Sequence, residues 1–172
     1  MRFGLIDRVL EVDPAERIVA VKAVSLGEEY LADHFPTFPV LPGVFMLESM
    51  VEAASWLVRL THDFAHSAIL LESARGVTYK SFVAPGHLLR VEVTCRRMAR
   101  EASEFGGVGY RDGVEVVKGR FALKHFNLSA RLPGSEALDR RIVEEARKRW
   151  ALLWRGANIE AVSQSIRNGD AD

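Results

Sequence analysis

The sequence contains one cysteine, Cys95, among its 172 residues. A single thiol can neither close a disulfide within the chain nor supply a cysteine-rich zinc site, so both kinds of stabilised module are excluded. Apolar runs are short as well, and none reaches the roughly 18 residues that a membrane-spanning helix requires. Charged residues follow the first methionine too closely for the apolar core of a signal peptide, and we therefore expect a cytoplasmic protein.

The sequence also lacks an excess of charge of either sign. Lys and Arg together number 23, and Asp and Glu together number 23, so the formal net charge is zero. Nucleic-acid-binding domains normally have a basic excess, and we expect no nucleic-acid partner here. A length within the roughly 100–200 residues of a common domain and a hydrophobic share of 48% favour one compact core.

Hydrophobic periodicity predicts six strands and two helices, without internal repeats. Residues 88–98 alternate apolar and polar positions, the pattern of a half-exposed strand. Asp112-Gly113 between two such segments indicates a tight hairpin turn. The predicted strands are residues 5–12, 18–24, 69–82, 88–98, 104–111 and 114–126. Strands in sequence around a single helix, rather than alternating with helices, indicate an α+β fold.

The first predicted helix, residues 44–60, is apolar on nearly every side, which predicts that it is buried. Its few polar positions include the carboxylates Glu48 and Glu52, which we therefore expect to be buried with it. The second predicted helix, residues 135–154, has one apolar face and more basic than acidic side chains. Its predicted apolar face consists of Leu138, Ile142, Ala146, Trp150 and Leu153.

The segment before the first helix concentrates residues suited to acid–base chemistry. Three prolines between residues 36 and 42 exclude a helix or a central strand and predict a stiff, extended loop. His34 begins this loop, and Gly43 ends it with a backbone N–H at a helix N-terminus, where a developing oxyanion can bind. Glu48 follows within the first turns. A base, an acid and an oxyanion donor are what proton abstraction beside a carbonyl requires.

Residues 34–48, HFPTFPVLPGVFMLE, resemble the active-site signature of the FabZ-type 3-hydroxyacyl-acyl-carrier-protein dehydratases. The resemblance continues on both sides, in LIDRVL at 5–10, GEEYL at 27–31 and YKSFVAPGHL at 79–88. It covers roughly residues 4–126, and a motif of this length is highly specific. A glutamate at position 48 is similar to the dehydratase-only branch, since the dehydratase/isomerase branch usually has aspartate there.

The resemblance implies a hotdog fold, in which a curled antiparallel sheet wraps around one long central helix. It implies two regions, a hotdog domain at 1–130 and a C-terminal helical extension at 131–172. It also implies a homodimer or a trimer of dimers, with each active site formed by the histidine of one protomer and the acidic residue of the other.

The implied reaction converts (3R)-3-hydroxyacyl-acyl-carrier-protein to the trans-2-enoyl thioester without a metal or organic cofactor. By resemblance, His34 removes the C2 proton, Glu48 of the other chain helps the hydroxyl leave, and the Gly43 amide binds the thioester carbonyl. Further substrate-binding candidates are Val44, Phe38 and Phe82. Acyl carrier protein is acidic, so we expect it to bind a local basic surface, on the C-terminal helix or near Arg75 and Lys80.

Four positions depart from the family pattern, namely Asp33, Thr37, Glu52 and His87. Glu52 replaces the usual glutamine one turn after Glu48, so two carboxylates repel each other unless one is protonated or Glu52 pairs with a base. Glu52 also motivates an alternative function as an acyl thioesterase. A second alternative is a non-catalytic acyl-binding or structural protein that has kept the fold.

Other candidate sites in the sequence are weaker. His62 and His66 have the i, i+4 spacing of a metal pair, but no third ligand is evident, and we predict no metal site. Cys95 alternates with polar strand residues and is interpreted as a small packing residue. Ser55 lies mid-helix without the sequence context of a nucleophile.

Overall fold

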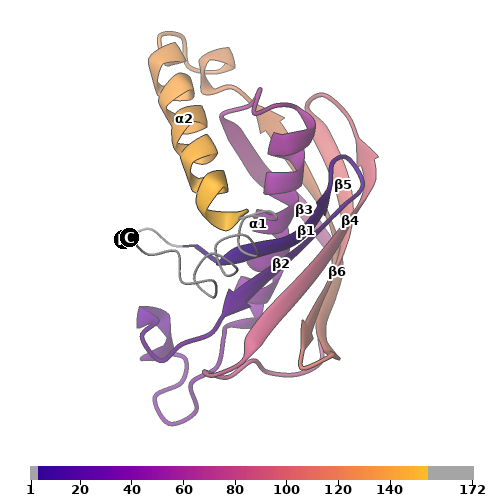
Figure 1. Ribbon diagram of the computed structural model, residues 1–172, viewed down its shortest axis with the longest axis vertical. Coiled ribbons are helices and arrows are strands. Elements are labelled where there is room, and N and C mark those ends of the chain that lie inside the picture. Colours follow the sequence, from indigo (N-terminus) through magenta and orange to yellow (C-terminus); the bar gives the residue numbers. More distant parts are fainter. Residues whose placement is uncertain (1–3, 155–172) are drawn as a thin grey trace, which may run out of the picture.

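The computed structural model describes residues 4–154, which form one curled antiparallel sheet and two long helices (Figure 1). The strand order across the sheet is β1-β2-β4-β5-β6-β3. The strands are β1 (Arg8–Asp13), β2 (Arg17–Ala23), β3 (Ala68–Tyr79), β4 (Leu88–Met98), β5 (Ala102–Arg111) and β6 (Val114–Phe126). β1 and β3 are therefore the two edges, although β3 directly follows the central helix in sequence.

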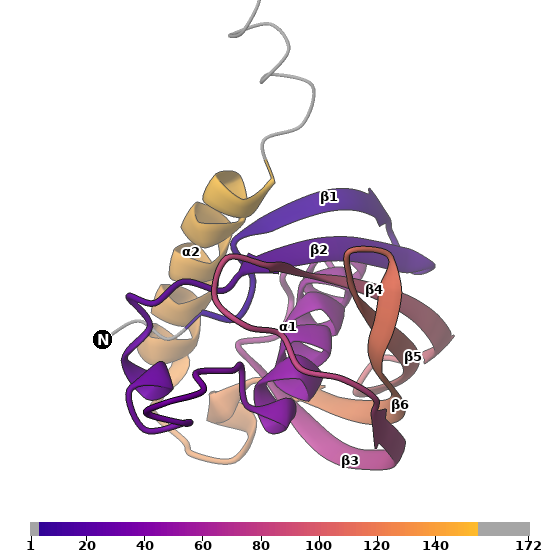
Figure 2. The same cartoon turned by 90° about the horizontal axis from the view of Figure 1, so that it is seen from below.

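The helix α1 (Gly43–Thr61) lies inside the curve of this sheet, as Figure 2 shows when the molecule is seen along the helix. Its stripe of Met46, Met50, Ala53 and Leu57 is at most 2% exposed and packs against the strands. The sheet must approach α1 closely, because a Cβ added at Gly107 would lie 2.6 Å from the Met50 sulfur. The predicted α+β hotdog architecture is confirmed.

The predicted boundaries hold to within a few residues, and β4 and β6 match at both ends. The largest differences, of three residues, are at β1, which starts at Arg8 rather than residue 5, and at β3, which ends at Tyr79 rather than residue 82. Its pairing with β6 is irregular between Arg75 and Thr78, where Gly76 has a φ of +60°. Beyond the strand the chain turns toward the loop before α1, and the Leu41 N–H donates to the Val83 carbonyl at 2.8 Å.

The second helix, α2 (Glu136–Leu153), packs across α1 on the side away from the sheet (Figures 1 and 2). Ala146 and Leu153 belong to the same hydrophobic cluster as the α1 core residues. The Trp150 ring lies 5.9 Å from the Trp56 ring of α1, centroid to centroid. The extension predicted at 131–172 thus includes a helix that shares the core, while residues 155–172 lie outside the described part of the chain.

The apolar face of α2 differs from the prediction at its first turn. Leu138 is 41% exposed, whereas the neighbouring Asp139 is buried. The Asp139 carboxylate accepts hydrogen bonds from the Ser67 hydroxyl and from the Leu128 and Ser129 N–H groups. Burial opposes its charge, but hydrogen bonds from Ser67, Ser129 and the backbone hold its pKa well below the usual range. The start of α2 is therefore fixed by a polar contact that an apolar pattern cannot indicate.

Three histidines meet where α1 ends, namely His62, His66 and His125, with ring centroids 5.1–5.5 Å apart. Within residues 4–154, no group of three or more His, Cys, Asp or Glu side chains is arranged to hold a metal ion. His125 is fully buried, with Nδ1–H donating to the Arg100 carbonyl and Nε2 accepting from the Ser103 hydroxyl. Across the same described residues, neither helix has the length and hydropathy of a membrane span.

Burial makes His125 a source of acid sensitivity in the folded protein. Burial lowers its pKa from 6.5 to about 4, so the unfolded chain gains a proton on this ring at a higher pH than the folded chain does. We expect the free energy of unfolding to fall as the pH drops from about 6.5 to about 4. In His125→Gln, which can keep both hydrogen bonds but does not titrate, urea unfolding curves should show a smaller fall.

The control is His87→Gln, which changes a half-exposed histidine at the Pro85-Gly86 turn and should leave the fall in place. Equal pH slopes for wild type and His125→Gln would contradict the assignment of the acid sensitivity to His125.

Candidate active site

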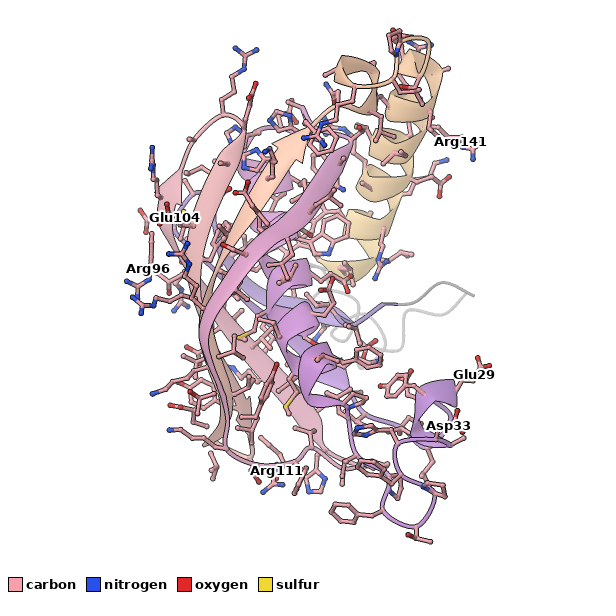
Figure 3. All side chains as sticks on the ribbon, turned by 180° about the vertical axis from the view of Figure 1, so that it is seen from behind. Glu29, Asp33, Arg96, Glu104, Arg111 and Arg141 are labelled. Atoms are coloured by element: carbon pink, nitrogen blue, oxygen red, sulfur yellow. The ribbon has the colours of Figure 1, made fainter. Side chains whose placement is uncertain are left out.

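The loop from Asp33 to Pro42 is held by its own backbone (Figure 3, lower right, with Asp33 labelled). Phe35 and Phe38 exchange backbone hydrogen bonds of 3.2 and 3.0 Å, and the Val40 N–H donates to the His34 carbonyl at 3.0 Å. The loop is fixed as predicted, but the prediction that it is extended was wrong, because the Phe35–Phe38 hydrogen bonds close it into a compact turn. It gives the side chain of His34 little freedom to move.

His34 is half-buried and stacks on the Phe35 ring at 4.1 Å. Its Nδ1 lies 3.0 Å from the Val40 carbonyl oxygen, so Nδ1 carries the proton and donates it. In this tautomer the opposite nitrogen, Nε2, is an acceptor. No hydrogen bond occupies Nε2 within residues 4–154, and it can take a proton from a substrate.

Gly43 is the first residue of α1, and the preceding Pro42 has no side chain that could cap the helix. Among the described residues, nothing accepts a hydrogen bond from the N–H groups of Gly43 and Val44, as expected at the first turn of a helix. The space at the Gly43 α-carbon, however, belongs to Tyr79, whose ring would lie 3.3 Å from an added Cβ. A side chain at position 43 would therefore press on the Tyr79 ring unless that half-exposed ring moved slightly, a contact that the sequence did not indicate.

Glu48 lies in the second turn of α1, where the single chain leaves it exposed, so the prediction of burial at this position was wrong. Its side chain contributes to a hollow of about 480 Å³ between α1, α2 and the start of β3. Although the side chain is exposed, neighbouring protein groups remove part of the hydration of its carboxyl. This desolvation first, and the charge of Glu52 second, raise the pKa of Glu48. A raised pKa suits a carboxyl group that donates a proton near neutral pH.

Glu52 is not an unexplained extra carboxylate. One oxygen accepts a 2.6 Å hydrogen bond from the Arg149 guanidinium of α2, and the other accepts a 2.7 Å bond from the Leu5 N–H. The sequence left two possibilities, that one of the two carboxylates is protonated or that Glu52 pairs with a base. The structure shows the pairing, with Arg149.

The apolar substrate-binding candidates gather near the loop. The rings of Phe38 and Phe82 meet edge to face at 5.6 Å, and both side chains are more than half exposed. Val44 is 63% exposed at the start of α1. Arg111, labelled at the lower edge of Figure 3, donates to the Phe82 carbonyl and fixes that segment.

Within one chain, His34 and Glu48 do not interact. Over residues 4–154, no hydrogen bond or ion pair joins them, and the groups that shift the Glu48 pKa do not include His34. The two candidate groups are therefore not joined within the chain, and, of the strands in residues 4–154, the edge strand β3 pairs with β6 alone.

A family model for the FabA-like domain matches residues 1–123, which is more than half of the chain. This chain belongs to the FabA-like family. It is 39% identical over 116 residues to the 3-hydroxyacyl-[acyl-carrier-protein] dehydratase FabZ of Magnetococcus marinus, covering 64% of this chain and 74% of that protein. It is 37% identical over 122 residues to the FabZ of Acidiphilium cryptum, covering 70% and 74%. The FabZ-like resemblance of its motifs is thus confirmed.

Solved structures similar to this FabA-like chain agree on the fold. The dehydratase heterocomplex ApeI:P from Xenorhabdus doucetiae aligns with a TM-score of 0.59 at 21% identity, covering 71% of this chain and 82% of that one. The smu.793 protein from Streptococcus mutans, bound to acetyl-CoA, aligns with a TM-score of 0.52 at 13% identity, covering 69% and 86%. At such identities the likeness shows the shared fold alone.

The FabA-like match ends at residue 123, and α2 lies beyond it. Sequence reasoning identified the basic composition of α2 but missed that Arg149 reaches the helix of Glu48. The only signal was indirect, because Glu52 required a cationic partner and α2 was rich in arginine. Of the basic residues considered near the site, Lys80 pairs with Glu115 at 2.7 Å, whereas Arg75 borders a hollow in the sheet with Arg96 and Arg120.

The contact between His34 and Val40 leads to a direct spectroscopic prediction. Because Nδ1–H donates to the carbonyl, we expect the neutral ring to be the Nδ1–H tautomer in long-range ¹H–¹⁵N spectra. Comparison with His34→Gln assigns the signals. A neutral ring that carries its proton on Nε2 would contradict the proposed free base.

Proposed function

We propose that this FabA-like protein dehydrates 3-hydroxyacyl groups carried on acyl carrier protein, in fatty-acid or related acyl-chain synthesis. The observation that carries the proposal is the loop geometry, in which Val40 holds Nδ1 of His34 and leaves Nε2 free. The unoccupied N–H groups at the start of α1 add the oxyanion donor that such a reaction requires.

In the proposed mechanism, the thioester carbonyl accepts a hydrogen bond from the Gly43 N–H, with the Val44 N–H beside it. Nε2 of His34 takes the proton from C2, and the electrons of that C–H bond form the C2=C3 double bond. Glu48, from the other protomer, gives its proton to the 3-hydroxyl, and the C3–O bond breaks to release water. The thioester itself acidifies C2, so the mechanism requires no metal or cofactor.

A homodimer would complete this site, and the strand β3 is its proposed interface. β3 is an edge strand of 12 residues that carries the exposed side chains of Leu70 and Leu71, at 55% and 40%. Long exposed edges are normally paired or protected. A two-fold axis through β3 would set the end of one strand, beside the loop of His34, against the start of the other, beside the hollow of Glu48.

The acyl chain would lie against the exposed rings of Phe38 and Phe82 and against Val44, since these side chains flank the loop of His34. We propose acyl carrier protein as the partner, attracted by local basic groups, because the net charge of the chain is zero. A trimer of dimers and a cytoplasmic location stay predictions.

The thioesterase alternative was motivated by Glu52 as an unexplained carboxylate, and the structure gives Glu52 hydrogen-bond partners. Both of its oxygens accept hydrogen bonds, from Arg149 and from the Leu5 N–H, which gives Glu52 a structural role in joining α1, α2 and the N-terminal segment. A non-catalytic binding protein differs from the proposal only in turnover, which the following assay measures.

Removing either acid–base group should abolish most turnover. We expect His34→Ala and Glu48→Gln each to lower kcat by about 10²–10⁴-fold, the usual contribution of a general acid or base. The measurement is the ultraviolet absorbance of enoyl thioester formed from 3-hydroxyacyl-acyl-carrier-protein.

His87→Ala and Glu29→Gln are matched controls at positions outside the site and should retain activity. A thiol reagent in the same assay detects hydrolysis, so release of free thiol as the main product would favour a thioesterase. An inert wild type that binds the acyl ligand would favour the non-catalytic alternative.

Mixing the two inactive variants tests the shared site directly. If His34 and Glu48 act from different chains, a hybrid of His34→Ala and Glu48→Gln contains one site with both groups intact. Random reassembly should then restore about a quarter of the wild-type activity, since half the dimers are hybrids with one intact site each. No recovery after verified subunit exchange would place both groups in one chain.

A further inference from the structure

One ion pair joins the helix of the proposed acid to the helix that lies beyond the family match. The Arg149 guanidinium and the Glu52 carboxylate are 2.6 Å apart, with side chains only 34% and 17% exposed. The second carboxylate oxygen of Glu52 accepts the Leu5 N–H. Glu52 thus connects α1, α2 and the segment that leads into β1.

The N-terminal segment is shaped around this pair. A Cβ added at Gly4 would lie 2.5 Å from the Arg149 guanidinium, so a side chain there would displace it. Trp150, the next residue of α2, packs near Trp56 of α1 and holds the helix in position. Arg149 is therefore placed by packing on both sides and does not extend freely from the surface.

The pair belongs to a polar stripe along α1. Glu48, Glu52, Ser55 and Arg59 recur at helical spacing, and all four contribute to the same 480 Å³ hollow. The charged side chains that α2 adds to this hollow are Glu145 and Arg149, while the β3 contribution is apolar, from Ile69.

Two other charged side chains that line the hollow, Arg59 and Glu145, interact with groups other than Glu48. The Arg59 guanidinium donates to the His66 and Ser67 carbonyls at 3.1 and 3.4 Å. Glu145 forms an ion pair with Lys148 at 3.6 Å. Glu52 is one helical turn from Glu48. The Glu52–Arg149 pair is therefore the charged neighbour that can influence the ionisation of the proposed acid.

We propose that Arg149 is a positioning residue of the active site: it fixes the Glu52 carboxylate one turn from Glu48, and through it α2 helps to set how readily Glu48 holds its proton. This inference rests on the proposed function for its purpose, but its physical content concerns only the charges in one hollow.

The two members of the pair act on Glu48 with opposite sign. The negative charge of Glu52 favours the protonated form of Glu48, and Glu52 is one of the two causes that raise the Glu48 pKa. In the proposal, Arg149 offsets part of that charge through its ion pair with Glu52. A family-typical glutamine at position 52 would require no cation, whereas the glutamate here is accompanied by one from the added helix.

The test is a set of charge variants with a readout that does not require turnover. The ¹³C signal of the Glu48 carboxyl is followed against pH in ligand-free protein and assigned with Glu48→Gln. Glu52→Gln should lower the Glu48 pKa, and Arg149→Gln should raise it, each by about half a pH unit, a roughly threefold change in the ionisation constant. The double variant should return close to wild type, because both charges are gone.

Arg149→Lys is the conservative control, which keeps the charge and should keep the Glu48 pKa near that of wild type. Thermal unfolding of every variant separates stability from titration, since loss of the pair should destabilise both single variants in the same direction. Shifts of the same sign in Glu52→Gln and Arg149→Gln, or no shift in either, would overturn the proposal.

The pH profile of kcat supplies a second readout, in which the Glu48-dependent limb should move in the same opposite directions. If the wild type is inactive but the carboxyl shifts as described, the proposed function fails and the coupling stands. If it is active but the carboxyl does not shift, the coupling alone fails.

Discussion

The structure depends on the burial of one stripe of α1 by a sheet that curls around it. Met46, Met50, Ala53 and Leu57 occupy that stripe and fix the rotation of the helix about its axis. The polar stripe must then face away from the sheet, into the hollow beside α2. It consists of Glu48, Glu52, Ser55 and Arg59. Core packing therefore orients the proposed acid, Glu48, whose hollow is also lined by the core residues Val51 and Trp56.

The proposed base, His34, is positioned by a different principle. Three prolines and a set of backbone hydrogen bonds fix the loop of His34, and one carbonyl, that of Val40, selects the nitrogen that carries the proton. The loop is joined to the rest of the molecule by the bond from the Leu41 N–H to the Val83 carbonyl and by the buried side chains of Val40 and Leu41. The proposed acid is oriented by a helix in the core and the proposed base by a local turn, so the two candidate groups are positioned independently of each other.

The element pattern of the fold could be predicted closely from sequence. Alternation in 88–98 and the Asp112-Gly113 turn gave two strands with correct ends, because such signals are local. The departures concern pairs distant in sequence. Asp139 is buried because Ser67 and the 128–129 backbone bind it, and Glu48 is exposed because a single chain does not cover it.

The sequence by itself determined the family and the order of the elements, and it singled out His34, Gly43 and Glu48 as the proposed site, since contiguous motifs record local geometry and residue chemistry. Only the tertiary structure decided that Tyr79 occupies the space beside Gly43 and that Arg149 pairs with Glu52, 97 residues away. The reason is physical: an ion pair depends on where two helices meet, and the rotation of each helix is set by apolar packing that is distributed over the whole chain.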